Sequence, residues 1–125
     1  MSCSSCHAMH AKDAAPRTVD ALNTACVKCH QEQRGPWVFE HEAVAREGCV
    51  SCHKPHGSIN PKMTTERDYN LCLKCHFSAV QYQSIGHYAH RRALNPSSLG
   101  VSLTNCMGCH RAVHGSNFSK ELRTQ

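Results

Sequence analysis

The stretch CVSCHKPHGS, residues 49–58, holds two cysteines, a histidine directly after the second, and another histidine three residues further on. Cys-x-x-Cys-His is the attachment signature of c-type haem, in which the two sulfurs form thioethers to the porphyrin and the histidine binds the iron. Proximal and distal ligands stand on opposite faces of a flat ring. His56 lies too close to His53 in sequence to reach the opposite face, so we expect it to bind the iron of a different haem.

All ten cysteines of the chain fall into five such motifs, and a histidine follows each motif directly. One such motif is also compatible with a zinc ribbon, a disulfide framework or a thioredoxin-like redox pair. Five motifs with no cysteine left over favour five covalent haems. The predicted thioether residues are Cys3, Cys6, Cys26, Cys29, Cys49, Cys52, Cys72, Cys75, Cys106 and Cys109, and the predicted proximal iron ligands are His7, His30, His53, His76 and His110.

Six histidines lie outside these positions, and five irons each need one distal ligand. Methionine is the other common distal ligand, but Met9 and Met107 are poorly placed to reach the nearby iron. We therefore predict that all five irons have two histidine ligands, which makes them low-spin with low potentials. The predicted distal ligands are His10, His41, His56, His114 and His87, with His90 as the alternate to His87.

The spacing of the motifs indicates an internal repeat within a single pentahaem domain, residues 1–125. The first cysteines stand at positions 3, 26, 49, 72 and 106, and both residues 26–58 and residues 72–116 end in His-Gly-Ser. These two stretches look like copies of one two-haem unit, the second with an insertion. Aligning them places His87 opposite His41 and leaves His90 without a counterpart, which favours His87 as the ligand.

The composition predicts a fold built on its cofactors. Hydrophobic residues make up 40% of the 125 residues, but ten of them are cysteines and only seven are aromatic. Small domains with such weak cores usually depend on staples, and five haems supply large apolar faces. We predict a multihaem cytochrome c in which short helices and irregular loops wrap a row of haems, with little or no sheet. Helices are expected near residues 19–30, 40–47, 65–76 and 84–94.

Charge and hydropathy narrow the possible partners and location. The formal charge is +5, but a ferric haem with two histidines and two ionised propionates carries about −1, so five haems nearly cancel it. The positive charge that would favour nucleic-acid binding is therefore nearly absent once the haems are counted. No apolar run is long enough to cross a bilayer, and no signal peptide is visible before Cys3. Because c-type haem is attached outside the cytoplasm, we expect export to the periplasm or the cell exterior.

Two long stretches resemble the periplasmic decahaem cytochromes of the MtrA/DmsE type. They are GPWVFEHEAVAREGCVSCHKPHGSINPKMTTERDYNLCLKCH and NCMGCHRAVHGSNFSKEL, and the resemblance covers roughly residues 26–118. The resemblance implies haems strung in a chain that pass electrons across the periplasm or through an outer-membrane porin. On matching positions it carries over His41, His56 and His114 as distal ligands. The chain has five attachment sites instead of ten and is more loosely similar to the small pentahaem donor of periplasmic nitrite reductase.

The favoured function is electron transfer through the row of haems, with no catalysis, because an iron with two histidine ligands has no place for substrate. The expected partners are donor and acceptor cytochromes or reductases, with an outer-membrane porin as a further candidate. An alternative is a subunit of an extracellular cytochrome filament, in which copies of the chain are the partners. A multihaem nitrite or hydroxylamine-type oxidoreductase needs an open iron with acid and base groups nearby, and the surplus of histidines disfavours it.

Overall fold

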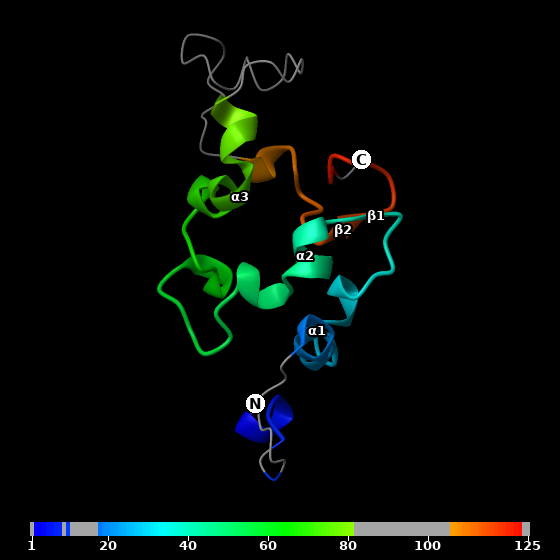
Figure 1. Cartoon of the computed structure of the whole chain (residues 1–125), viewed down its shortest axis with the longest axis vertical. Coiled ribbons are helices and arrows are strands. Elements are labelled where there is room, and N and C mark those ends of the chain that lie inside the picture. The colour runs from blue at the N-terminus through cyan, green and yellow to red at the C-terminus, as the bar shows by residue number, and fades with distance from the viewer. Residues whose placement is uncertain (1, 9, 11–17, 82–105, 124–125) are drawn as a thin grey trace.

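The computed structural model describes residues 2–8, 10, 18–81 and 106–123, and three helices organise this part of the chain. They are α1 (Val19–Val27), α2 (Glu42–Arg46) and α3 (Tyr69–Gln81). Figure 1 shows the N-terminal segment at one end of the longest axis and α3 towards the other, with α2 between them. The molecule is therefore elongated, and its first and fourth attachment motifs lie towards opposite ends.

Local sequence explains where the helices begin and end. Thr18 caps α1, because its hydroxyl accepts a hydrogen bond from the amide of Ala21 at 3.3 Å. Helix α1 ends at Val27, three residues before the predicted end and one residue after the first cysteine of the second attachment motif. Helix α3 begins at Tyr69, four residues later than predicted, and runs through the fourth motif. The helix predicted at residues 84–94 lies outside the described residues.

Short 3₁₀ turns form much of the remaining structure. They are η1 (Cys3–Ser5), η2 (Gln31–Gln33), η3 (Cys49–Ser51), η4 (Pro61–Met63) and η5 (Cys106–Gly108). Three of the five begin at the first cysteine of an attachment motif. The loop after the third motif folds back on it, since the amide of Thr65 donates to the carbonyl of Cys52 at 2.8 Å. This return holds the loop that carries His56.

A two-stranded antiparallel sheet joins distant parts of the chain. Strand β1 (Phe39–Glu40) pairs with β2 (Gly115–Ser116), with Phe39 opposite Ser116. The amide of Val38 extends the contact by donating to the Asn117 side chain at 3.1 Å. His41 directly follows β1 and His114 directly precedes β2. The small sheet therefore brings two of the predicted distal ligands to neighbouring positions. Short helices, irregular loops and one minimal sheet confirm the predicted fold class.

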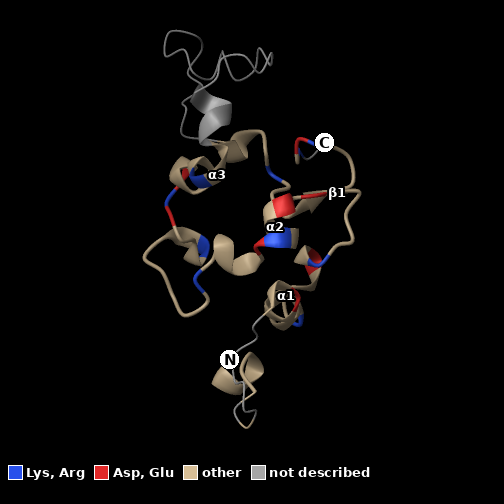
Figure 2. Ribbon diagram, viewed as in Figure 1, with Lys and Arg blue, Asp and Glu red and all other residues tan. Residues whose placement is uncertain are grey.

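The described residues contain no buried hydrophobic side chain, and the one buried polar side chain is Ser116, at 3% exposure. Polar contacts link the elements instead. Asn23 on α1 donates to the carbonyl of Val44 on α2 and accepts from the amide of Cys49, each at 2.9 Å. Figure 2 shows acidic and basic residues interspersed along the described ribbon. A protein-only core is too small to explain the fold, which agrees with a fold built around apolar cofactors.

Candidate functional site

The attachment motifs share one local turn. In four of them the carbonyl of the first cysteine accepts a hydrogen bond from the amide of the histidine, at distances between 2.8 and 3.1 Å. The amide of the second cysteine donates to the same carbonyl at 3.2–3.3 Å. The fourth motif lies inside α3, where His76 leaves helical geometry with φ −95° and ψ 24°. These turns place two thiols and an imidazole close together, as thioether attachment and axial ligation of one haem require.

The first cysteines of neighbouring motifs approach one another. The thiol of Cys49 lies close to that of Cys26, and the thiol of Cys72 lies close to that of Cys106. Burial and the neighbouring thiol raise the pKa of Cys49, and burial and Cys106 raise the pKa of Cys72 to about 11. None of the ten cysteines forms a disulfide. The second and third motifs therefore meet at their first cysteines, and the fourth and fifth motifs do the same.

Among the described residues the histidines form three ring pairs, and each pair joins a motif histidine to one of the six other histidines. The ring centroids of His7 and His56 are 5.9 Å apart, with planes inclined by 28°. The corresponding values are 6.1 Å and 19° for His41 with His76, and 6.2 Å and 14° for His53 with His114. No pair joins a motif histidine to the histidine that closely follows the same motif, so the pairs connect segments that are far apart in sequence.

The spacing of these pairs fits one iron atom between two imidazoles. A metal–imidazole bond is about 2.0 Å long. A five-membered ring with bonds of about 1.35 Å has its atoms about 1.15 Å from the centre. Two imidazoles on opposite sides of one metal thus have ring centres about 6.3 Å apart. The three observed separations lie between 5.9 and 6.2 Å.

Backbone carbonyls orient three of the imidazoles for metal binding. The Nδ1 atom of His41 lies 2.8 Å from the Val113 carbonyl, and that of His53 lies 3.0 Å from the Lys62 carbonyl. His110 makes the same contact with Glu121 at 2.5 Å. A carbonyl can only accept, so each Nδ1 carries the proton and each Nε2 is left with a lone pair for a metal. The residues present therefore fit haem iron.

The electrostatics of His114 also suit a ligand. Burial lowers its pKa, and His53 and His41, which are close enough to repel its protonated form, add to the effect. Because a metal-binding imidazole must be neutral, a lowered pKa keeps His114 available at a lower pH than an ordinary histidine.

Comparison with known protein families agrees with the attachment motifs. The sequence profile of the doubled CXXCH motif family matches residues 1–35 and 41–81, which is more than half of the chain. The chain belongs to the doubled CXXCH motif family. Each matched stretch contains two of the attachment motifs, the first with the second and the third with the fourth. Membership supports covalent c-type haem and electron transfer in a multihaem c-type cytochrome. No curated protein matches the chain.

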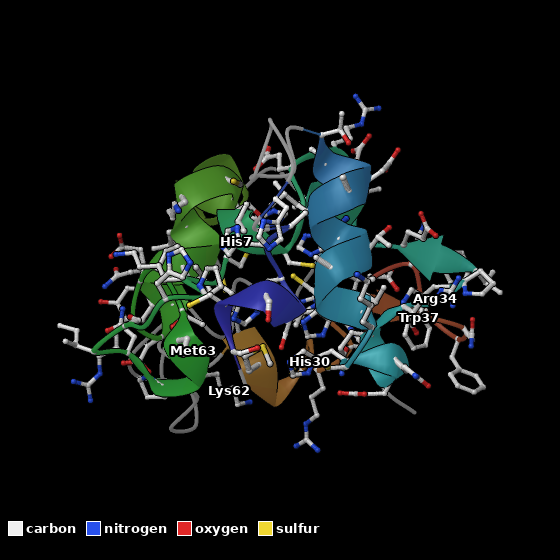
Figure 3. The ribbon with its side chains drawn as sticks, turned by 90° about the horizontal axis from the view of Figure 1, so that it is seen from below. His7, His30, Arg34, Trp37, Lys62 and Met63 are labelled. Carbon is white, nitrogen blue, oxygen red and sulfur yellow. The ribbon has the colours of Figure 1, made fainter. Side chains whose placement is uncertain are left out.

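Three histidines of this doubled CXXCH protein lie outside the ring pairs but within the described residues, namely His10, His30 and His110. His30 follows α1, has a side chain that is 64% exposed, and places Nδ1 3.8 Å from a carboxylate oxygen of Glu32. His10 is exposed. Figure 3 shows His7 between α1 and α3, His30 close to the end of α1, and Trp37 and Arg34 on the far side of α1 from α3. His87 and His90 lie outside the described residues, so the choice between them remains a prediction.

Sequence reasoning identified the residues of the three ring pairs but not which histidine pairs with which. It also missed the backbone carbonyls that orient the rings, for which no side-chain pattern exists. Asn23, which ties the third motif to α1 and α2, had no signal in the spacing either.

None of the helices within the described ranges is long and apolar enough to span a membrane.

Proposed function

We propose that the chain is a single pentahaem domain that transfers electrons through five c-type haems, each held by two histidines. The observation that carries the proposal is the set of three ring pairs, whose separations of 5.9–6.2 Å each fit one iron. When bound, each haem supplies a one-electron iron couple. His56 serves the haem on Cys3 and Cys6, and His114 serves the haem on Cys49 and Cys52.

The pair of His41 with His76 supplies both iron ligands of the haem on the fourth motif, with His76 as the proximal ligand and His41 as the distal ligand. The two remaining haems, with proximal ligands His30 and His110, take their distal ligands from His10, His87 and His90. In this arrangement each ligand pair joins two remote segments, so the ligands set the distances between haems as well as their potentials.

The adjacent cysteines support a continuous row of haems. Thioethers form at the haem edge, so the contacts of Cys26 with Cys49 and of Cys72 with Cys106 bring the edges of consecutive haems together. Cys52 is near enough to raise the pKa of Cys72, which relates the third motif to the fourth. Close edges favour electron transfer along the chain. The internal repeat of residues 26–58 and 72–116 provides this order.

With two histidine ligands on each iron, the chain's own residues exclude substrate from the metal. The protein is then an electron carrier of the periplasm or the cell exterior, similar to the MtrA/DmsE type, and it exchanges electrons with donor and acceptor cytochromes or reductases. Two assemblies can use such a row of haems. One is a filament built from copies of the chain, and the other is a complex with an outer-membrane porin.

Two measurements on the haem-loaded protein test the proposal. Intact mass should show five covalently bound haems. Visible and EPR spectra should show low-spin ferric haem for at least the three haems of the ring pairs, and carbon monoxide should leave these haems unchanged after reduction. Fewer than five haems, or high-spin iron at a haem with a paired histidine, would contradict the proposal.

A further inference from the structure

The loops that follow the third and fifth motifs both contain His-Gly-Ser, and both return to the motif from which they start. The Nδ1 atom of His53 lies 3.0 Å from the Lys62 carbonyl, and that of His110 lies 2.5 Å from the Glu121 carbonyl. In each case the carbonyl belongs to the far end of the loop. The orientation of these two proximal imidazoles therefore depends on the contacts that fix the loop end.

The residue after each accepting carbonyl has the same unusual backbone. Met63 (Figure 3) and Leu122 both have φ 55°, in the left-handed region that residues with a Cβ rarely adopt. The Met63 carbonyl accepts a hydrogen bond from the Lys54 amide at 2.7 Å, and the Leu122 carbonyl accepts one from the Ala112 amide at 2.9 Å. Both loop ends are thus bound to residues just after a proximal histidine, and a strained turn that recurs in this place points to a shared role.

The serine of each His-Gly-Ser stretch fastens the loop end. The Ser58 hydroxyl donates to the Thr64 carbonyl at 2.7 Å, and the Ser116 hydroxyl donates to the Arg123 carbonyl at 3.1 Å. Each hydroxyl also accepts from the amide two residues further on, at 3.0 and 3.1 Å. In the third-motif loop the Asn60 side chain adds a second bond to the Thr64 carbonyl, at 3.0 Å. Thr64 and Arg123 stand two residues after the carbonyl that the histidine contacts, so the serine closes the loop next to that carbonyl.

These contacts recur although the two loops differ in length and in sequence. The fifth-motif loop has one more residue before His-Gly-Ser, and one more between the serine and the carbonyl to which it donates. The carbonyls that face the imidazoles come from unlike residues, Lys62 and Glu121. In these two described loops the shared contacts use the side chains of the motif histidine and the serine, and otherwise backbone groups. The serine is thus the side chain through which the sequence specifies this loop.

We propose that Ser58 and Ser116 are positioning residues that keep the reduction potentials of the third and fifth haems low, an inference that rests on the proposed haem ligation. A carbonyl that accepts from the Nδ1–H group makes an imidazole a stronger donor through Nε2. A stronger donor favours ferric over ferrous iron, and such hydrogen bonds are one means by which a protein sets a haem potential. The serine holds the carbonyl in place, so its loss should weaken the Nδ1 hydrogen bond and raise the potential of that haem.

The first test compares the haem-loaded wild type, Ser116→Ala and the matched control Asn117→Ala by spectroelectrochemical titration, with the ferric spin state measured by EPR. Ser116→Ala removes the bond to the loop end, whereas the neighbouring Asn117 side chain bonds the Val38 amide instead. Ser116→Ala should move about one fifth of the titration amplitude to higher potential, by about tenfold in the ferric–ferrous equilibrium constant, or about 59 mV for one electron. Asn117→Ala should keep the wild-type curve, and all three proteins should stay low-spin.

The third haem supplies a second test with a graded result. Ser58→Ala should raise the potential of one haem by less than Ser116→Ala does, because Asn60 keeps its own bond to the same carbonyl. Ser51→Ala is the matched control at this motif. Its hydroxyl also donates to a carbonyl at 2.7 Å, but that carbonyl belongs to Gly48, which is not part of the loop. Ser51→Ala should therefore leave the titration curve unchanged.

Removal of the attachment cysteines locates each shift. In a Cys106→Ala/Cys109→Ala background, which lacks the fifth haem, Ser116→Ala should have no further effect on the titration. The same should hold for Ser58→Ala in a background that lacks the third haem.

The inference is overturned by an unchanged or lowered potential in either serine variant, by an equal shift in a control variant, or by a shift that persists without the haem concerned. High-spin iron in a serine variant would also overturn it, because the serine would then be needed for ligation itself. If one serine variant loses haem, the other decides the test, and loss of haem from both would reduce the serines to a folding role. Failure of the proposed ligation is separate, since it would appear as high-spin iron in the wild type.

Discussion

Removing His114 should open the haem on Cys49 and Cys52 and leave the other four haems unchanged. The ring of His114 lies 6.2 Å from that of His53, close to the roughly 6.3 Å expected across one iron. His114→Ala removes the distal ligand and leaves His53 in place on the other face. One haem in five should become high-spin, so the ferric protein should lose about one fifth of its low-spin signal.

The assay is EPR and visible spectroscopy of the ferric protein, with haem quantified per chain. Added imidazole should restore the low-spin state, because it fills the place left by the missing ring. A control separates ligand loss from damage to the small sheet. Asn117→Ala removes the hydrogen bond to the Val38 amide next to that sheet but keeps every histidine. It should retain the full low-spin signal.

The location of the open haem can also be fixed. Cys49→Ala/Cys52→Ala removes the attachment site of the haem that His53 binds. In that background His114→Ala should have no further effect on the spectrum. The assignment is refuted if His114→Ala stays fully low-spin, if Asn117→Ala has the same effect, or if high-spin iron persists in the background without that haem.

Two further predictions concern other contacts. His41→Ala should make the haem of His76 high-spin in the same EPR assay, whereas Glu42→Ala, next to it and exposed, should not; equal effects would contradict the pairing. Asn23→Ala should lower the free energy of unfolding by about 1–3 kcal/mol in denaturant titrations, because two partners in the partly buried contact lose their hydrogen bonds; an unchanged midpoint would remove Asn23 from the packing.

Local chemistry made the attachment sites predictable from sequence. A c-type motif spans five residues, and its turn depends on hydrogen bonds within those residues, as the shared bond from histidine amide to cysteine carbonyl shows. The expectation of short helices and little sheet followed from the few apolar residues. Helix ends were less predictable, since α3 begins at Tyr69 and continues through a motif that was expected to end it.

The sequence by itself determined that the chain carries five attachment motifs and which residues belong to them, and it predicted that His56 reaches a haem other than its neighbour's. Only the tertiary structure decided that His56 faces His7, that His114 faces His53 and that His41 faces His76. The physical reason is the distance along the chain between the residues that must meet. Attachment is made within one turn, but a distal ligand must cross to the far face of a ring held by a remote segment. That crossing depends on contacts such as the pairing of Phe39 with Ser116, which no local pattern encodes.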